Sequence, residues 1–312
     1  MQTIFLLCLW FIFDVCSSPL YIESPDGFKL YTVTYATHVN RKDFCNVMKS
    51  AWGWGFQVNV IGQRRSRQYE KYHLVDKVFA LRKFIRKLPK RNSGKNVIMF
   101  MDAYDVLVNA SPFDLLQRFL DTDKKVLFAS EKGCCSTKWY MMNRMNTCDS
   151  KWPIDVRNHT SPWINTGVFI GYQNELRVLL DAAWIEYHQT LKEIQPGQVD
   201  PYVSGSDQQL IGQLFSYHKE LRERISMGID VMSEVFQCMY KVAYIDSIDL
   251  LFHENRVAFK GSAYTYPVMV HFNGPKQIKQ AMMEYFFARV VLPKIHNNSA
   301  IRNITYLETC FN

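Results

Sequence analysis

Apolar runs alternate with segments of helical spacing through the first half of this 312-residue chain. The run Val97–Met101 has no polar interruption, which is typical of a strand buried on both faces of a sheet. Residues 74–88 instead carry apolar side chains at intervals of three and four, and this period predicts an amphipathic helix. Further strands are expected over 30–36, 57–61 and 126–130, and further helices over 43–52 and from the capping pair Ser111-Pro112. Strands that alternate with helices predict an α/β fold, with a mostly parallel central sheet flanked by helices.

The second half begins with an irregular segment and then returns to regular elements. Residues 133–161 follow neither period, which is typical of a functional or disulfide-tied loop. A strand over 163–172, a helix over 175–191, a helix capped by Ser206 and a strand over 266–272 come next. There is no repeat and no linker, so we expect a single domain over 19–290 and a polar C-terminal tail over 291–312.

The first residues have the features of a secretory signal peptide. An apolar run over 4–15 is followed by small residues at 16–18, and the run is too short for a convincing membrane span. We therefore expect residues 1–18 to be a signal peptide and no stable membrane span elsewhere, with a retained N-terminal anchor as the alternative. Sequons at Asn158, Asn297 and Asn303 agree with passage through the secretory pathway, whereas Asn109, which follows the Val97 strand, is expected to stay unmodified.

Six of the eight cysteines follow the expected signal peptide, namely Cys45, Cys134, Cys135, Cys148, Cys238 and Cys310. An even number in an oxidising compartment predicts disulfides, with a bridge that involves the loop containing residues 134–148. The pairing does not follow from the sequence. A zinc site is the alternative, but it lacks a Cys-x-x-Cys pair.

Composition and charge narrow the range of functions. With 48% hydrophobic and 21% charged residues the chain is typical of a globular protein. Its net charge of +8 includes a basic cluster over residues 64–95, which suits nucleic acid, a phosphorylated donor or an acidic partner. No nucleic-acid-binding motif accompanies the cluster, so nucleic acid is not an expected partner.

Two carboxylates end the Val97 strand and point to a metal site. Asp102 and Asp105 are three positions apart, and ligands of open α/β sheets bind beyond the carboxyl ends of the strands. Buried carboxylates need a partner, and a divalent cation that bridges substrate phosphates is one such partner. A helix cap or a turn is the structural alternative. His271 ends another apolar strand, and its imidazole can complete a manganese site or be a hydrogen-bonded core residue.

Four further segments hold candidate binding residues, each with a structural alternative. Gly274 in the His271 segment permits close approach to a phosphate that Lys276 would neutralise, or it forms a plain turn. Asn165 and Thr166 would contact a sugar or form a turn before a core strand. Asp207 at a helix start would contact a sugar or act as a catalytic carboxylate, or its charge would merely be stabilised by the helix dipole. The segment Tyr35-Ala36-Thr37 would lie beside a nucleotide base and ribose, or simply leave the strand.

Over residues 30–285 these segments resemble the glycosyltransferase domain of the procollagen lysyl hydroxylases. The order and spacing of the motifs carry the resemblance, rather than any one of them. The motifs are Phe100-Met101-Asp102-Ala103-Tyr104-Asp105-Val106-Leu107, Ser111-Pro112, Leu115-Leu116, Asn165-Thr166-Gly167-Val168-Phe169-Ile170-Gly171-Tyr172, Ser206-Asp207-Gln208-Gln209-Leu210 and Tyr266-Pro267-Val268-Met269-Val270-His271-Phe272-Asn273-Gly274-Pro275. The resemblance implies a GT-A fold and a manganese-dependent enzyme that uses a UDP-sugar.

The resemblance also implies roles for individual residues. Asp102, Asp105 and His271 would hold the metal, and Asp207 would be a catalytic carboxylate near the transferred sugar. Residues expected to bind the donor are Tyr35, Ala36, Thr37, Lys77, Asp102, Ala103, Tyr104, Asn165, Asn273, Gly274, Pro275 and Lys276. Phe272 departs from the pattern, because the family has a glycine there, and a narrower phosphate-side loop is expected. A run of several acids in the family is reduced here to Asp207, and no His-x-Asp iron motif of a hydroxylase is present.

The expected function is transfer of glucose or galactose from a UDP-hexose to an acceptor hydroxyl in the endoplasmic reticulum lumen or outside the cell. The acceptor implied by the resemblance is a hydroxylysine-linked glycan on a collagen-like or other secretory-pathway protein. Two alternatives remain open at this point. One is a catalytically weak relative that binds UDP-sugar or sugar, and the other is a metal-dependent phosphohydrolase.

Overall fold

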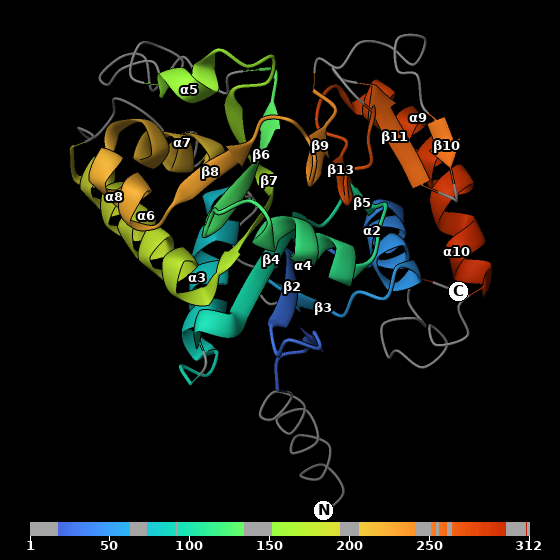
Figure 1. Ribbon diagram of the computed structural model, residues 1–312, viewed down its shortest axis with the longest axis horizontal. Coiled ribbons are helices and arrows are strands. Elements are labelled where there is room, and N and C mark those ends of the chain that lie inside the picture. Colours follow the sequence, from blue (N-terminus) through green and yellow to red (C-terminus); the bar gives the residue numbers. More distant parts are fainter. Residues whose placement is uncertain are drawn as a thin grey trace, which may run out of the picture.

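A seven-stranded sheet forms the centre of the computed structural model, with strand order β1-β2-β4-β7-β6-β8 and β3 paired to β2 (Figure 1). The structure describes residues 18–62, 74–91, 93–133, 152–193, 206–240, 251–253, 256–260, 264–297 and 310. The strands of this sheet are β1 (Ile22–Glu23), β2 (Lys29–Tyr35), β3 (Val58–Ile61), β4 (Asn96–Asp102), β6 (Val126–Glu131), β7 (Trp163–Tyr172) and β8 (Met227–Asp230).

Five of these seven strands share one direction, and β1 and β7 run against it. β2 is parallel to both β3 and β4, and β6 is parallel to β8, whereas β7 is antiparallel to β4 and β6. The expected α/β fold with a mostly parallel sheet is therefore confirmed, with β7 as the exception near the centre. Because β7 is a long strand with a register shift opposite Phe128 and Ala129, it carries Asn165 and Thr166 within the sheet rather than in a turn before it.

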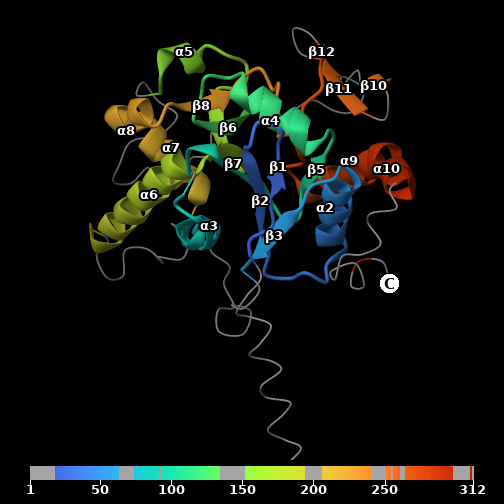
Figure 2. The same ribbon diagram turned by 60° about the horizontal axis from the view of Figure 1, so that its bottom comes forward.

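Helices cover both faces of the sheet, and the views agree on their sides (Figures 1 and 2). One face carries α3 (Val75–Lys87), α6 (Gln173–Glu193), α7 (Asp207–Tyr217) and α8 (Lys219–Arg224); the other carries α2 (Lys42–Gly53), α4 (Pro112–Leu120), α9 (Lys276–Phe286) and α10 (Leu292–Asn297). The remaining helical segments are α5 (Ile154–Arg157), a 3-10 turn (Ser93–Lys95) and a π-helical turn (Phe287–Val291). In the described part of the chain, no helix combines the length and the apolar character that crossing a bilayer requires.

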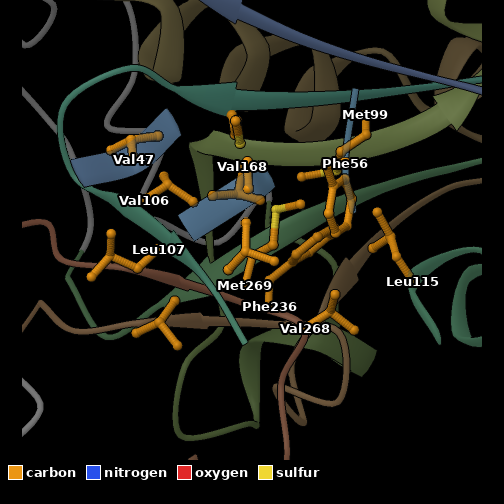
Figure 3. Close-up of a cluster of buried hydrophobic side chains, with 14 of the residues drawn as sticks. Val47, Phe56, Met99, Val106, Leu107, Leu115, Val168, Phe236, Val268 and Met269 are labelled. Carbon is orange, nitrogen blue, oxygen red and sulfur yellow. The ribbon is translucent and has the colours of Figure 1, made fainter. Parts of the chain in front are cut away.

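The side chains of β4 alternate between two hydrophobic cores, which explains its uninterrupted apolar run. Val97, Met99 and Met101 pack with α2 and α4 in one core, whereas Ile98 and Phe100 pack with α3, α6 and α7 in the other. Figure 3 shows part of the first core, where Met99 lies among side chains from several elements. A strand covered on both faces needs apolar residues at consecutive positions.

A small three-stranded sheet extends the first core. It has the order β5-β13-β9, formed by β5 (Val106–Val108), β13 (Met269–His271) and β9 (Phe236–Cys238). β13 is antiparallel to β5 and parallel to β9, and its register pairs His271 with Val106 and with Cys238. A third sheet joins β10 (Leu251–His253), β11 (Arg256–Lys260) and β12 (Tyr264–Thr265).

A disulfide joins Cys45 of α2 to Cys310, across a sequence separation of 265 residues. Cys238 is buried and has a free thiol. The expected bridge from residues 134–148 and the signal peptide both lie outside the described residues. The segment expected to form a polar tail contains α10 and Cys310.

Candidate functional site

Two carboxylates and one imidazole meet where β4 and β13 end. Asp102 is the last residue of β4, Asp105 lies in the turn to β5, and His271 is the last residue of β13. One candidate ligand atom from each lies within 4.8 Å of the others. The Nε2 atom of His271 is 3.5 Å from Oδ1 of Asp105 and 3.8 Å from Oδ2 of Asp102. The structure thus brings together the three residues that the sequence indicates as metal ligands.

Hydrogen bonds orient the imidazole of His271. Its Nδ1 lies 2.9 Å from Oδ1 of Asn165, and the same oxygen accepts the backbone N–H of Gly167 at 2.9 Å. Because that oxygen only accepts, the contact assigns the His271 proton to Nδ1 and turns the Nε2 lone pair toward the carboxylates. A hydrogen-bond acceptor on the ring nitrogen that faces away from the metal is the usual partner of a metal-binding histidine.

A buried lysine connects this cluster to Asp207. Lys77 on α3 is only 5% exposed, and its Nζ is 2.8 Å from Oδ1 of Asp102 and 2.9 Å from Oδ2 of Asp207. Asp207 is 2% exposed, begins α7 after the capping residue Ser206, and also accepts a hydrogen bond from the hydroxyl of Thr166. Asp207 is therefore linked to the candidate ligand Asp102 through Lys77, and its carboxylate is occupied by two protein side chains, those of Lys77 and Thr166.

The charges of the cluster suit a divalent cation. Four carboxylates (Asp102, Asp105, Asp207 and Glu131) face two ammonium groups (Lys77 and Lys279), which leaves a formal charge of −2 if the imidazole is neutral, as a metal ligand must be. Two carboxylates and an imidazole are a donor set that magnesium-like and manganese ions accept. The residues present therefore fit a divalent metal.

The two carboxylates of this candidate metal site differ in their electrostatic surroundings. Burial raises the pKa of Asp102, and the neighbouring Asp105 adds to this effect, although Lys77 opposes it. Burial also acts to raise the pKa of Asp105, but with no metal bound and His271 protonated at both ring nitrogens, the charges and hydrogen bonds of His271 and Lys279 outweigh burial and hold that pKa well below its usual range. Asp105 is thus the more firmly ionised ligand of the two.

Glu131 is a buried carboxylate that the sequence reasoning missed. It ends β6, and its oxygens accept hydrogen bonds from the side-chain amides of Asn165 (3.0 Å), Gln208 (2.5 Å) and Asn273 (2.6 Å). Burial raises the pKa of Glu131, and these hydrogen bonds oppose the rise. The signal was available, because Glu131 follows an apolar strand as Asp102 does. Glu131 therefore connects Asn165, which orients His271, with Asn273 of the phosphate-side loop (residues 273–275).

The phosphate-side loop, residues 273–275, is held firmly against β9. The Oδ1 atom of Asn273 accepts the backbone N–H groups of Met239 and Tyr240, both at 3.0 Å. Gly274 has φ +130°, a conformation that favours glycine, and Pro275 precedes the first turn of α9. Lys276 begins α9, and its side chain lies outside the described residues.

Phe272 does not narrow the phosphate-side loop. Its ring is buried against Phe286 of α9, with centroids 5.6 Å apart, and its backbone N–H donates to the carbonyl oxygen of Asp105 at 2.7 Å. The expectation of a constricted loop is therefore wrong, because the aromatic side chain points into the core.

A cavity of about 740 Å³ opens beside the carboxylates. Its lining includes Tyr35, Thr37, Asp102, Ala103, Tyr104, Asp105, Arg41 and Lys279. The phenol oxygen of Tyr104 accepts the backbone N–H groups of Thr37 (3.1 Å) and His38 (3.0 Å), which fixes its ring beside the end of β2. Ala36 is fully buried and does not line the cavity. Its backbone N–H donates to the carbonyl oxygen of Ile61.

Comparison with known proteins establishes the class of the protein. A family model described as PLOD GT domain matches residues 27–295, so the chain is a member of a glycosyltransferase family. It belongs to the family of PLOD GT domains, which confirms the resemblance inferred from the motifs.

The relatives are longer proteins. Human multifunctional procollagen lysine hydroxylase and glycosyltransferase LH3 is 27% identical over 256 residues, which cover 80% of this chain and 30% of LH3. The Caenorhabditis elegans multifunctional procollagen lysine hydroxylase and glycosyltransferase is 26% identical over 262 residues, which cover 80% of this chain and 31% of that protein. The chain thus spans less than a third of the length of these relatives. A solved glycosyltransferase structure, involved in glycosylation of the major capsid of PBCV-1, matches with a TM-score of 0.44 at 15% identity, covering 82% of this chain and 98% of the other.

Proposed function

We propose that this chain transfers a hexose, glucose or galactose, from a UDP-sugar to an acceptor hydroxyl. One observation carries the proposal: Asp102 and Asp105, together with His271 from a distant part of the chain, bring ligand atoms within 4.8 Å of one another, and both carboxylates line the cavity. Membership of a glycosyltransferase family supports the same reading.

Three residues would hold a manganese ion and others would position the donor. Asp102, Asp105 and His271 would be its ligands, and a metal bound there supplies Lewis-acid stabilisation of the negative charge on departing UDP. Tyr104, fixed by two backbone N–H groups, would pack beside the uridine together with Tyr35 and Thr37, which line the same cavity. Ala103, which lines the same cavity, would complete this wall, whereas the buried Ala36 would support the end of β2 without contacting the donor.

The phosphate side of the donor site would be the 273–275 loop. Asn273 is locked to β9 and to Glu131, so the backbone at Gly274 and Pro275 is presented in one conformation. The start of α9 at Lys276 follows directly, and helix N-termini favour anionic groups. Asn165 would act indirectly, because it orients His271.

The geometry favours a positioning role for Asp207. Its carboxylate accepts from Lys77 and Thr166, and Lys77 in turn contacts the proposed ligand Asp102. Asp207 would therefore hold the Lys77 ammonium at the donor side of the site. An Asp207→Asn variant should then weaken donor binding more than it lowers turnover at saturating donor.

We further propose a collagen-like or other secretory-pathway protein as acceptor, in the endoplasmic reticulum lumen or outside the cell. The relatives that the chain matches are procollagen-modifying enzymes by name, and the Cys45–Cys310 disulfide suits an oxidising compartment. Secretory localisation would be tested by following a tagged full-length chain through cell fractionation.

The test is release of UDP from UDP-glucose and UDP-galactose, with manganese or with EDTA, in the presence of deglycosylated collagen peptides. We expect release that needs both metal and acceptor, and its loss in Asp105→Ala. Asp155→Ala, at an exposed position on α5, is the matched control and should keep activity. Full activity of Asp105→Ala would refute the metal assignment. Binding without turnover would instead indicate a sugar-binding relative, and cleavage of simple phosphate esters a phosphohydrolase.

A further inference from the structure

Asp105 presents its two oxygens to two different groups. Oδ1 faces Nε2 of His271 at 3.5 Å, whereas Oδ2 accepts a hydrogen bond from the ammonium of Lys279. A cation bound among Asp102, Asp105 and His271 would use the first oxygen and leave the second with Lys279. One carboxylate can therefore serve a metal and an ammonium group at once.

The position of Lys279 is fixed by structure that also builds the phosphate-side loop. Lys279 lies in the first turn of α9, and its backbone N–H bonds to the carbonyl oxygen of Pro275 at 3.0 Å. Pro275 follows Asn273, which is anchored by two backbone N–H groups of the β9 side. Lys279 and the 273–275 loop are therefore held in fixed positions relative to each other.

Lys279 lines the cavity beside the proposed metal ligands, where an anionic donor group would lie. An ammonium group has three N–H donors, and the hydrogen bond to Asp105 uses one of them. Two other cations line this cavity, but they pair with other acids: Arg41 with Asp43, its guanidinium also lying 4.4 Å from the ring centroid of Tyr104, and Lys42 with Glu284 at 3.4 Å. Among the described cavity-lining residues, Lys279 is thus the cation in contact with a proposed metal ligand.

We infer that Lys279 is a diphosphate-binding residue that shares Asp105 with the metal, one carboxylate oxygen for each. This inference rests on the proposed function, since it assumes a nucleoside diphosphate in the cavity. Lys279 supplies a second positive charge to the diphosphate and at the same time competes electrostatically with the metal.

These two roles predict opposite effects of one substitution. In Lys279→Met the diphosphate loses a charged hydrogen-bond donor, so the affinity for UDP should fall about tenfold or more. The affinity for Mn²⁺ in the absence of UDP should instead rise severalfold, because a positive charge next to a ligand oxygen is removed. A merely structural role for Lys279 would lower both affinities or neither.

The experiment measures Mn²⁺ binding by electron paramagnetic resonance and UDP binding by calorimetry, the latter both with saturating Mn²⁺ and with EDTA. Lys279→Arg should retain most of the UDP affinity, because it keeps the charge. Lys219→Met is the charge-matched control; Lys219 is an exposed residue of α8 whose Nζ lies 3.7 Å from Glu223, and both affinities should be unchanged there. Thermal unfolding of every variant verifies that the fold is retained.

The outcomes separate the two claims. If the wild-type chain binds UDP and Lys279→Met binds it equally well, or if Mn²⁺ affinity falls in that variant, the role of Lys279 is refuted while the proposed function stands. If the wild-type chain binds no UDP with Mn²⁺ present, both the proposed function and the role of Lys279 are refuted.

Discussion

A methyl group added at Gly167 would occupy the space of the His271 ring. A Cβ atom at this position of β7 would lie 2.1 Å from Cε1, 2.6 Å from Nδ1 and 2.7 Å from Nε2 of His271. These separations are far below any van der Waals contact, so Gly167→Ala must displace either the ring or the strand. The substitution therefore tests whether the imidazole position matters, without removing a single candidate ligand.

The ring has little freedom to move. His271 is 4% exposed and is held through Nδ1 by Asn165, so displacement breaks that hydrogen bond and turns Nε2 away from the carboxylates. Overpacking of this kind costs about 1–3 kcal/mol of folding free energy. Loss of the orienting contact of a metal-bound histidine weakens metal binding by about 10–100-fold. We expect Gly167→Ala to fold with reduced stability and to bind Mn²⁺ weakly.

The matched control is Gly212→Ala on α7. There the nearest atom to an added Cβ is Cγ2 of Ile164 at 3.4 Å, an ordinary contact, and alanine favours a helix interior over glycine by about 1 kcal/mol. Mn²⁺ titration followed by electron paramagnetic resonance gives the metal affinity, and urea unfolding gives the stability. A folded Gly167→Ala variant with wild-type Mn²⁺ affinity would refute the claim that the close fit of Gly167 against the His271 ring sets the metal affinity.

Three further predictions concern stability. Burial raises the pKa of Asp230 to about 6 against three donated backbone N–H groups, so the folded state holds this proton more tightly than the unfolded state; the free energy of unfolding should therefore fall by about 3 kcal/mol as the pH rises from about 4 through 6. Urea unfolding at several pH values measures this fall, which should be shallower in Asp230→Asn because that side chain does not titrate. Cys45→Ser removes the disulfide to Cys310 and should cost about 2–5 kcal/mol in the same assay; unchanged stability would mean that the bridge does not form. Phe272→Ala empties a buried position against Phe286 and should cost about 3–5 kcal/mol in urea unfolding, whereas stability within experimental error of wild type would place the ring outside the core.

Local patterns carried enough information to predict the main elements of the central sheet. The apolar run that ends at Asp102 is β4, and the helical spacing over 74–88 is α3 at Val75–Lys87. The cap predicted at Ser111 is a capping box in which Ser111 and Asp114 bond each other's backbone N–H groups. These features depend on neighbours in the sequence, so the sequence displays them directly.

Features that depend on distant partners were harder to predict. β5 and β9 have three residues each, too few to show a period, and they exist because both pair with β13. The partner of Cys45 lies at the far end of the chain, and six cysteines alone permit many pairings. The place of Glu131 at a strand end is visible in the sequence, but its three amide partners come from separate elements and are not.

The position of His271 finally depends on the register of a very short strand pair. β13 opposes β5 so that His271 pairs with Val106, the residue after Asp105, and a shift by one residue would turn the imidazole to the opposite face. Asn109 fixes this register at the other end, since its backbone N–H bonds to Val268 at 2.7 Å and its side-chain amide donates to Pro267 at 2.9 Å. Asn109 is 0% exposed, so its sequon serves the fold and offers no accessible amide for glycosylation. The buried asparagine thus holds the strand pair that places His271, the proposed metal ligand, beside Asp102 and Asp105.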